Sequence, residues 1–144
     1  MAKNDRRRRE RRLHYRLMHR IYKLCGQYEW RLVYIDMFGN PRVSKRLGLT
    51  DRTGRPVTAC VGMVDEETRT IFVDYREDVI ATFVHECLHI LIGDSFVGDG
   101  DGKAEEAEVQ RLEKMMMRHM SPSQARRLHV HMTNMLGRIS VRHS

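Results

Sequence analysis

Two histidines and a glutamate stand at a spacing that can hold a metal ion, because residues 85–89 read HECLH, an HExxH motif. In a helix, residues i and i+4 lie on one face about 6 Å apart, so the imidazoles of His85 and His89 can converge on one zinc ion. Glu86 then lies beside the open coordination position. The flanking residues are almost all apolar, and burying these three side chains is costly unless a metal compensates. The motif therefore predicts a catalytic-type zinc site; the alternative is a pair of hydrogen-bonded core histidines.

A catalytic zinc ion usually has three protein ligands and one water, so a third ligand must come from another segment. Residues 103–113 offer three acids at the start of a helix whose apolar stripe begins at Val109: Glu105, Glu106 and Glu108. Glu106 precedes Val109 by three positions and Glu105 by four, so both flank the core-facing side, whereas Glu108 points further away. We expect Glu106 to be the third ligand, with Glu105 as the alternative. Acids in a first turn also simply complement the helix dipole, and three histidines are further candidate ligands or transition-state donors: His119, His129 and His131.

Helical periodicity predicts the elements that position these residues. Residues 79–92 suit a core helix buried on most faces, with Asp78 as N-cap and Gly93 as the stop. An acidic, glycine-rich loop over 93–102 leads to a second helix over 103–120. Ser121, followed by Pro122 and by Gln124 at the capping-box position, opens a last helix.

The strands are expected before the motif. Residues 30–35 are aromatic and β-branched, and 59–64 and 70–74 look like a hairpin around the turn 65–68. A turn at 39–41 and a long irregular loop over 43–58 separate the first strand from this hairpin. Near the N-terminus, Leu13, Leu17, Ile21 and Leu24 predict a helix that stops at Gly26. The predicted fold is α+β, with a short antiparallel sheet of about three strands packed on the helices.

These features together resemble a known family, the minimal gluzincin-type zinc metallopeptidases, including small bacterial and phage-encoded predicted peptidases. The similar stretch covers 59–117, where ACVGMVDEETRTIFVD, FVHECLHIL and EEAEVQRLE follow the order strand, turn, strand, active-site helix and glutamate helix. The resemblance implies a zincin-like domain that hydrolyses peptide bonds with a zinc-activated water. It makes His85, His89 and Glu106 the metal ligands and Glu86 the general base. It also implies that an extended peptide docks along the strand 70–73, taken as the sheet edge.

Length and composition bound these expectations. A chain of 144 residues can bury one modest core, so we expect a basic arm and helix over 1–26 and a single metallopeptidase domain over 27–144. Three cysteines without CxxC spacing exclude a disulfide framework and favour a reducing cytoplasm. No apolar run of about 18 residues and no signal-peptide core is evident, so we expect no membrane partner.

The charge is distributed unevenly. Residues 1–23 hold ten of the 26 Lys and Arg but only two of the 19 acids, so this segment has a net charge of +8. The other 121 residues have a net charge of −1, which gives +7 for the whole chain. Six arginines form the basic run: Arg6, Arg7, Arg8, Arg9, Arg11 and Arg12. They are either a solvated helix extension or a contact surface for nucleic acid. The alternative to a zinc endopeptidase is thus a nucleic-acid-associated binding protein whose zinc site is structural, or latent because the tail 129–132 closes it. No pattern indicates the substrate's identity or the oligomeric state.

Overall fold

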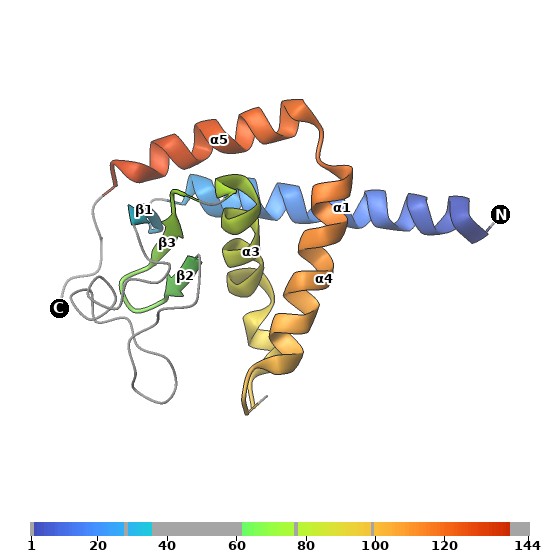
Figure 1. Ribbon diagram of the computed structural model, residues 1–144, viewed down its shortest axis with the longest axis horizontal. Coiled ribbons are helices and arrows are strands. Elements are labelled where there is room, and N and C mark those ends of the chain that lie inside the picture. Colours follow the sequence, from blue (N-terminus) through green and yellow to red (C-terminus); the bar gives the residue numbers. More distant parts are fainter. Residues whose placement is uncertain (1, 28, 36–61, 77, 99, 139–144) are drawn as a thin grey trace.

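The computed structural model describes residues 2–27, 29–35, 62–76, 78–98 and 100–138 (Figure 1). They form an α+β fold of four helices, one short 3₁₀ turn and three strands. Their bounds, in chain order, are α1 Ala2–Gly26, β1 Arg31–Ile35, β2 Gly62–Asp65, β3 Thr70–Asp74, α3 Val79–Ile92, η1 Gly93–Phe96, α4 Lys103–His119 and α5 Pro122–Leu136. The expected turn at 39–41, the loop over 43–58 and the start of the second strand at 59–61 lie outside the described residues.

The three strands form a mixed sheet in the order β1-β3-β2. The hairpin is confirmed, since β2 pairs antiparallel with β3. The expectation of a wholly antiparallel sheet is wrong, because β1 pairs parallel with β3, with Leu32 opposite Ile71. Only strands joined by a tight turn are constrained to be antiparallel, and the residues between β1 and β2 are too many to impose that constraint.

Strand β3 occupies the centre of the described sheet. All five of its residues are buried, and each of its edges pairs with a neighbour. The expectation that 70–73 forms a free sheet edge is therefore wrong, because a central strand has its backbone donors and acceptors engaged on both sides. In the described sheet, the edge strands are β1 and β2.

Helix α3 stands between the sheet and α4, while α1 crosses α3 and α4 and α5 runs along α1 and β1 (Figure 1). The core lies between these layers. Its stripe on α1 is the expected one, since Leu17, Ile21 and Leu24 are all buried. On α3 the apolar contribution comes from Phe83, Val84, Cys87 and Leu88. A fully buried side chain of this size stabilises the fold by about 1.5–3 kcal/mol, so these layers hold α3 firmly.

The helix ends follow the predicted capping. Asp78 accepts a hydrogen bond from the backbone N–H of Ala81 at 3.1 Å, and α3 ends at Gly93. At the start of α5, Ser121 and Gln124 form the complete capping box. Each such cap contributes about 1 kcal/mol. These caps fix the register of the helix that carries the HExxH motif and of the helix that follows α4.

By length and composition, the stretch Val79–Phe96 is apolar enough to cross a membrane, contrary to the sequence expectation. The core helix of a soluble protein meets the same criterion. Here the stretch comprises α3 and η1, and it packs on the sheet and on α4. It is accordingly weak support for a membrane span.

A buried histidine joins α1 to α5. His14 is 1% exposed, and its Nε2–H donates to Gln124 Oε1 at 2.9 Å. That oxygen also accepts the backbone N–H of Ser121, which fixes the orientation of the amide. Nδ1 of His14 has no hydrogen-bond partner. Burial lowers the pKa of His14, more than the bond to Gln124 raises it, because a proton on Nδ1 would be both charged and unpaired.

This lowered pKa predicts a pH-dependent stability. Above the ordinary histidine pKa of 6.5, His14 is neutral in both the folded and the unfolded chain. As the pH falls below that value, the unfolded chain takes up a proton that the folded chain refuses, so folding stability is lost. The variant His14→Gln lacks this effect. We expect it to be less stable than wild type by about 1 kcal/mol or more at pH 7.5, and the difference to shrink at pH 5.5.

Urea unfolding of both proteins at the two pH values measures this difference. The other titratable groups, including the neighbouring His119, are common to both proteins. A stability difference that stays constant between pH 7.5 and 5.5 would contradict the assignment of a neutral, buried His14.

Candidate metal centre

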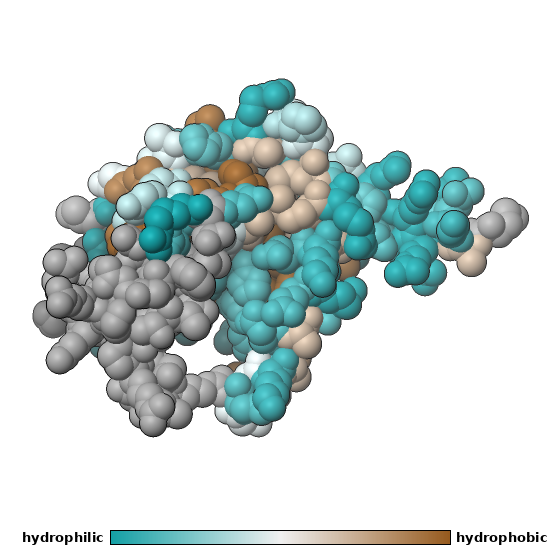
Figure 2. All heavy atoms as spheres, viewed as in Figure 1, coloured by the Kyte–Doolittle hydropathy of each residue, from teal (hydrophilic) through white to brown (hydrophobic). Residues whose placement is uncertain are grey.

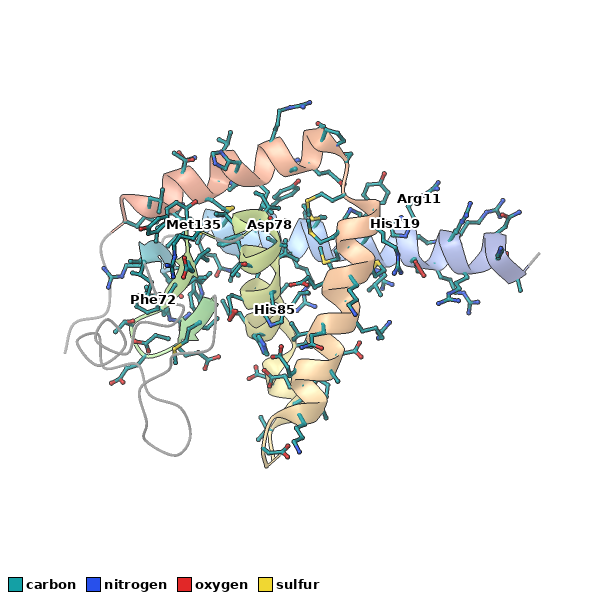
Figure 3. The ribbon with its side chains drawn as sticks, viewed as in Figure 1. Arg11, Phe72, Asp78, His85, His119 and Met135 are labelled. Carbon is teal, nitrogen blue, oxygen red and sulfur yellow. The ribbon has the colours of Figure 1, made fainter. Side chains whose placement is uncertain are left out.

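His85 lies on the face of α3 that is turned toward α4 (Figure 3). His89 lies on the same face, since it also contacts an acid of α4. One helical turn separates His85 from His89, and their ring centroids are 5.1 Å apart. Their side chains are 20% and 21% exposed, so solvent reaches both rings. The face that the spacing predicts therefore exists and is accessible.

Glu106 of α4 contacts both histidines. Its Oε1 lies 3.0 Å from His85 Nε2 and its Oε2 lies 2.8 Å from His89 Nε2. Within the described residues, these three form the one group of histidine, cysteine or acid side chains able to hold a metal ion, with ligand atoms within 4.8 Å of one another. Sequence analysis therefore named the acid that the fold brings to the histidines.

The geometry of this group fits a small divalent cation. Ligands at about 2.0–2.2 Å from a tetrahedral zinc ion lie about 3.3–3.5 Å from each other. The ligand atoms of the group lie within 4.8 Å of one another, and the contacts of 3.0 and 2.8 Å use different oxygens of Glu106, so the side chains need to adjust their positions to reach that arrangement. Two neutral imidazoles and one carboxylate are also a donor set that zinc prefers.

Two further acids contact the Nδ1 atoms of the two histidine rings. Glu113 Oε1 lies 3.1 Å from His85 Nδ1, and Glu105 Oε2 lies 2.5 Å from His89 Nδ1. A carboxylate that accepts the Nδ1 proton leaves the Nε2 lone pair free for a metal and fixes the ring orientation. Glu105, the alternative third ligand, thus contacts Nδ1 of His89, whereas Glu106 contacts Nε2 of the same ring. Glu113 was missed by sequence analysis, although it follows Glu106 by seven residues and so lies on the same helix face.

Glu86 lies on the buried side of α3, next to β2. It is 7% exposed, and a Cβ added to Gly62 would lie 3.0 Å from its Oε2 and 2.7 Å from Cγ2 of Thr82. Burial raises the pKa of Glu86 to about 7; the charge of His89 acts in the opposite direction, and the carboxylates of Glu106 and Glu113 add to the rise. A glycine at position 62 leaves the space that this carboxyl group occupies.

The cluster is electrostatically suited to a cation. Four carboxyl groups surround two imidazoles: Glu86, Glu105, Glu106 and Glu113. Burial lowers the pKa of His89, but the hydrogen bond that its Nδ1–H donates to Glu105 and the charges of the nearby acids outweigh this effect, so the pKa is raised overall. Positive charge is therefore favoured here, and a divalent metal ion would supply it in place of protons.

The other candidate ligands lie elsewhere. Glu108 pairs with Arg111, His119 contacts Glu10 of α1, and the ring of His131 lies 5.3 Å from that of Tyr22. His129, on α5, is not part of the metal-binding group either. The described cysteines Cys25 and Cys87 are buried, and burial raises the pKa of both thiols. They are therefore poor metal ligands.

Comparison with models of protein families, with curated proteins and with solved structures finds no match.

Because Glu105 and Glu113 contact the Nδ1 atoms of the two rings, we expect that replacing either acid weakens metal binding. Glu113→Gln replaces the carboxylate at His85 Nδ1 with a neutral amide, a weaker acceptor, so the ring is held less firmly and loses some basicity. We expect zinc to bind about 10- to 100-fold more weakly, as is usual for such supporting partners. Competition against a chromophoric zinc chelator measures this affinity. Glu108→Gln is the matched control, because it removes one negative charge from the same helix at a residue that pairs with Arg111; equal affinities in the two variants would contradict the supporting role.

The contact between β2 and α3 predicts a second effect. Gly62→Ala places a methyl group against Thr82 and Glu86, so β2 or α3 must shift, and we expect a loss of about 1–3 kcal/mol in the free energy of unfolding. Gly26→Ala is the control, since its Cβ would meet nothing within 4 Å. Urea unfolding of the two variants measures the loss in the free energy of unfolding. If Gly62→Ala is as stable as Gly26→Ala, the close contact between β2 and α3 is contradicted.

Proposed function

We propose that the chain is a zinc-dependent endopeptidase in which Glu86 is the general base. The observation that carries the proposal is the position of Glu106, whose two carboxylate oxygens contact both histidines of the HExxH motif. With this contact, Glu106 would supply the third of the three protein ligands that catalytic zinc sites use. The fourth position would then remain for water or substrate.

His85, His89 and Glu106 would hold the metal, with Glu105 and Glu113 orienting the two rings. Bound zinc would lower the pKa of a coordinated water to about 7 and polarise a peptide carbonyl. Both effects assist attack of water on an amide.

Glu86 would move the protons. Burial raises the pKa of Glu86 to about 7 in the metal-free chain, and a nearby zinc ion would lower it and favour the carboxylate form that accepts a proton. In this role a Glu86 Oε atom takes a proton from the attacking water and then delivers it to the leaving amine nitrogen. Its place one residue after His85 puts it next to the ligands without making it one.

The edge strand β2 is the suitable place for an extended substrate. In the described sheet β2 pairs on one side only, with β3, and its residue Gly62 lies against Glu86. A peptide that adds to this edge would bind through backbone hydrogen bonds. We therefore propose that an extended substrate docks along β2 and not along the central strand 70–73, because Gly62 of β2 lies against Glu86.

The reading of the zinc site as structural or latent is less well supported. A structural zinc ion has four protein ligands, whereas the group in the described residues has three. Residues 129–132 belong to α5, where the ring of His131 lies against Tyr22 of α1. No described residue of that tail is placed to close the site.

The central test is the pair Glu86→Gln and His85→Ala. Glu86→Gln should keep about one zinc per chain and lower the hydrolysis of casein by at least about a hundredfold, the usual contribution of a general base. His85→Ala removes one of three ligands and should lose both metal and activity. Metal content by mass spectrometry and casein cleavage separate the two effects. Equal cleavage by wild type and Glu86→Gln, or a wild type that retains zinc and cleaves nothing, would contradict the proposal.

A further inference from the structure

Residues 2–12 of α1, here called the basic arm, project beyond the body of the protein past α4 (Figure 1). Except for Glu10, all of them are exposed, while the following turns of the same helix are packed in the core. In the space-filling view the projecting end is almost entirely hydrophilic (Figure 2). A helix that leaves the body in this way is open to a partner around most of its circumference, except where Glu10 contacts α4.

Positive charge surrounds the arm. It carries seven basic residues and two acids, and four consecutive arginines cover the helix because successive residues are rotated by about 100°. On this geometry Arg7 and Arg11 lie on one side of the helix, and Arg9 and Arg12 lie on the nearly opposite side. A flat partner would contact only one of these sides.

Hollows on two sides of the arm are lined by bases. One, of about 420 Å³, is lined by Arg8, Arg9 and Arg12 together with Asp5. The other, of about 220 Å³, lies between the arm and α4, and its basic residues are Arg6, Arg111, Lys114 and Arg118. Two basic hollows flanking one helix can receive two separate rows of anions.

The root of the arm is held to α4. Glu10 contacts Arg118 and His119 at 3.2 Å each, and these contacts lower the pKa of its carboxyl group, with His119 as the largest cause. These contacts hold the root of the arm against α4, so the direction in which the helix leaves the body is set before any partner binds.

We propose that the basic arm binds duplex DNA by entering the major groove, where its two sides meet the two phosphate backbones. A helix with its side chains is about 10–12 Å wide, and the major groove is about 12 Å wide and 8.5 Å deep. The 11 residues of the arm span about 16 Å, enough to lie within the groove. Contacts to phosphates on both walls explain why the arginines are not confined to one face.

Other polyanions fit the arm less well. Residues 3–12 contain no apolar side chain, and a helix that binds a membrane surface needs an apolar face. They also contain no aromatic residue, whereas proteins that bind single strands stack bases on aromatic rings. The major groove of duplex RNA is too deep and narrow for side chains to reach its interior. Duplex DNA is the partner that matches both the shape and the charge.

Two double variants of the full-length chain test the two-sided contact: Arg7→Gln with Arg11→Gln, and Arg9→Gln with Arg12→Gln. Glutamine keeps the helix propensity close to that of arginine, and far-ultraviolet circular dichroism checks that α1 persists. Binding to a 20-base-pair DNA is measured between 0.05 and 0.2 M salt. Each variant should lower affinity by about tenfold or more at 0.1 M, and each should reduce the salt slope by about 1.8, which is 0.9 for each lost phosphate contact.

The control is Lys103→Gln with Arg126→Gln, which removes the same charge from exposed residues on α4 and α5. It should bind DNA within about twofold of wild type, with an unchanged slope. Duplex RNA and single-stranded DNA of the same sequence, and vesicles with anionic lipid, should all bind more weakly than duplex DNA. The proposal is overturned if full-length protein does not bind DNA at 0.05 M salt, if only one side of the arm contributes, if the control loses as much affinity, or if another polyanion binds as tightly. Zinc content is measured alongside and does not bear on this outcome.

Discussion

Helix α3 carries two histidines and a glutamate within a largely apolar sequence, and the elements packed around it provide partners for these polar side chains. Its apolar faces are covered by the sheet, α1 and α5, which leaves the face of His85 and His89 for α4. Helix α4 brings acids to that face while its own apolar residues join the common core. The polar side chains are thus compensated by a neighbouring helix, and the cost of burying them does not fall on α3 alone.

The helices and the group of side chains that could hold a metal could be predicted because their determinants are local. Asp78, Gly93 and the Ser121 capping box define helix ends through residues at most four positions away, and the step from Glu106 to Val109 places the acid relative to the core. The parallel pairing of β1 could not be predicted, since it depends on where a long intervening segment delivers the chain. For the same reason the central position of β3 was not apparent from its sequence.

The contacts that Glu105 and Glu113 make with the two histidines could not be predicted from the sequence. Glu105 and Glu106 are adjacent in the chain, yet one approaches Nδ1 and the other Nε2 of the same imidazole. Their difference arises from the angle between α3 and α4, which no local pattern encodes. Glu113 shares a helix face with Glu106, but only the position of His85 on the facing helix gives it a role.

Gln124 ties together two helices that are distant in the sequence. Its side-chain oxygen accepts hydrogen bonds from the backbone of Ser121 and from the ring of His14, and its backbone carbonyl accepts one from Tyr22. Unwinding the first turn of α5 would therefore also expose a buried imidazole of α1 that has no other partner for its donor. The two helices form one cooperative unit in this region, so their amide protons should exchange with solvent through a shared opening event and not through independent fraying of each end.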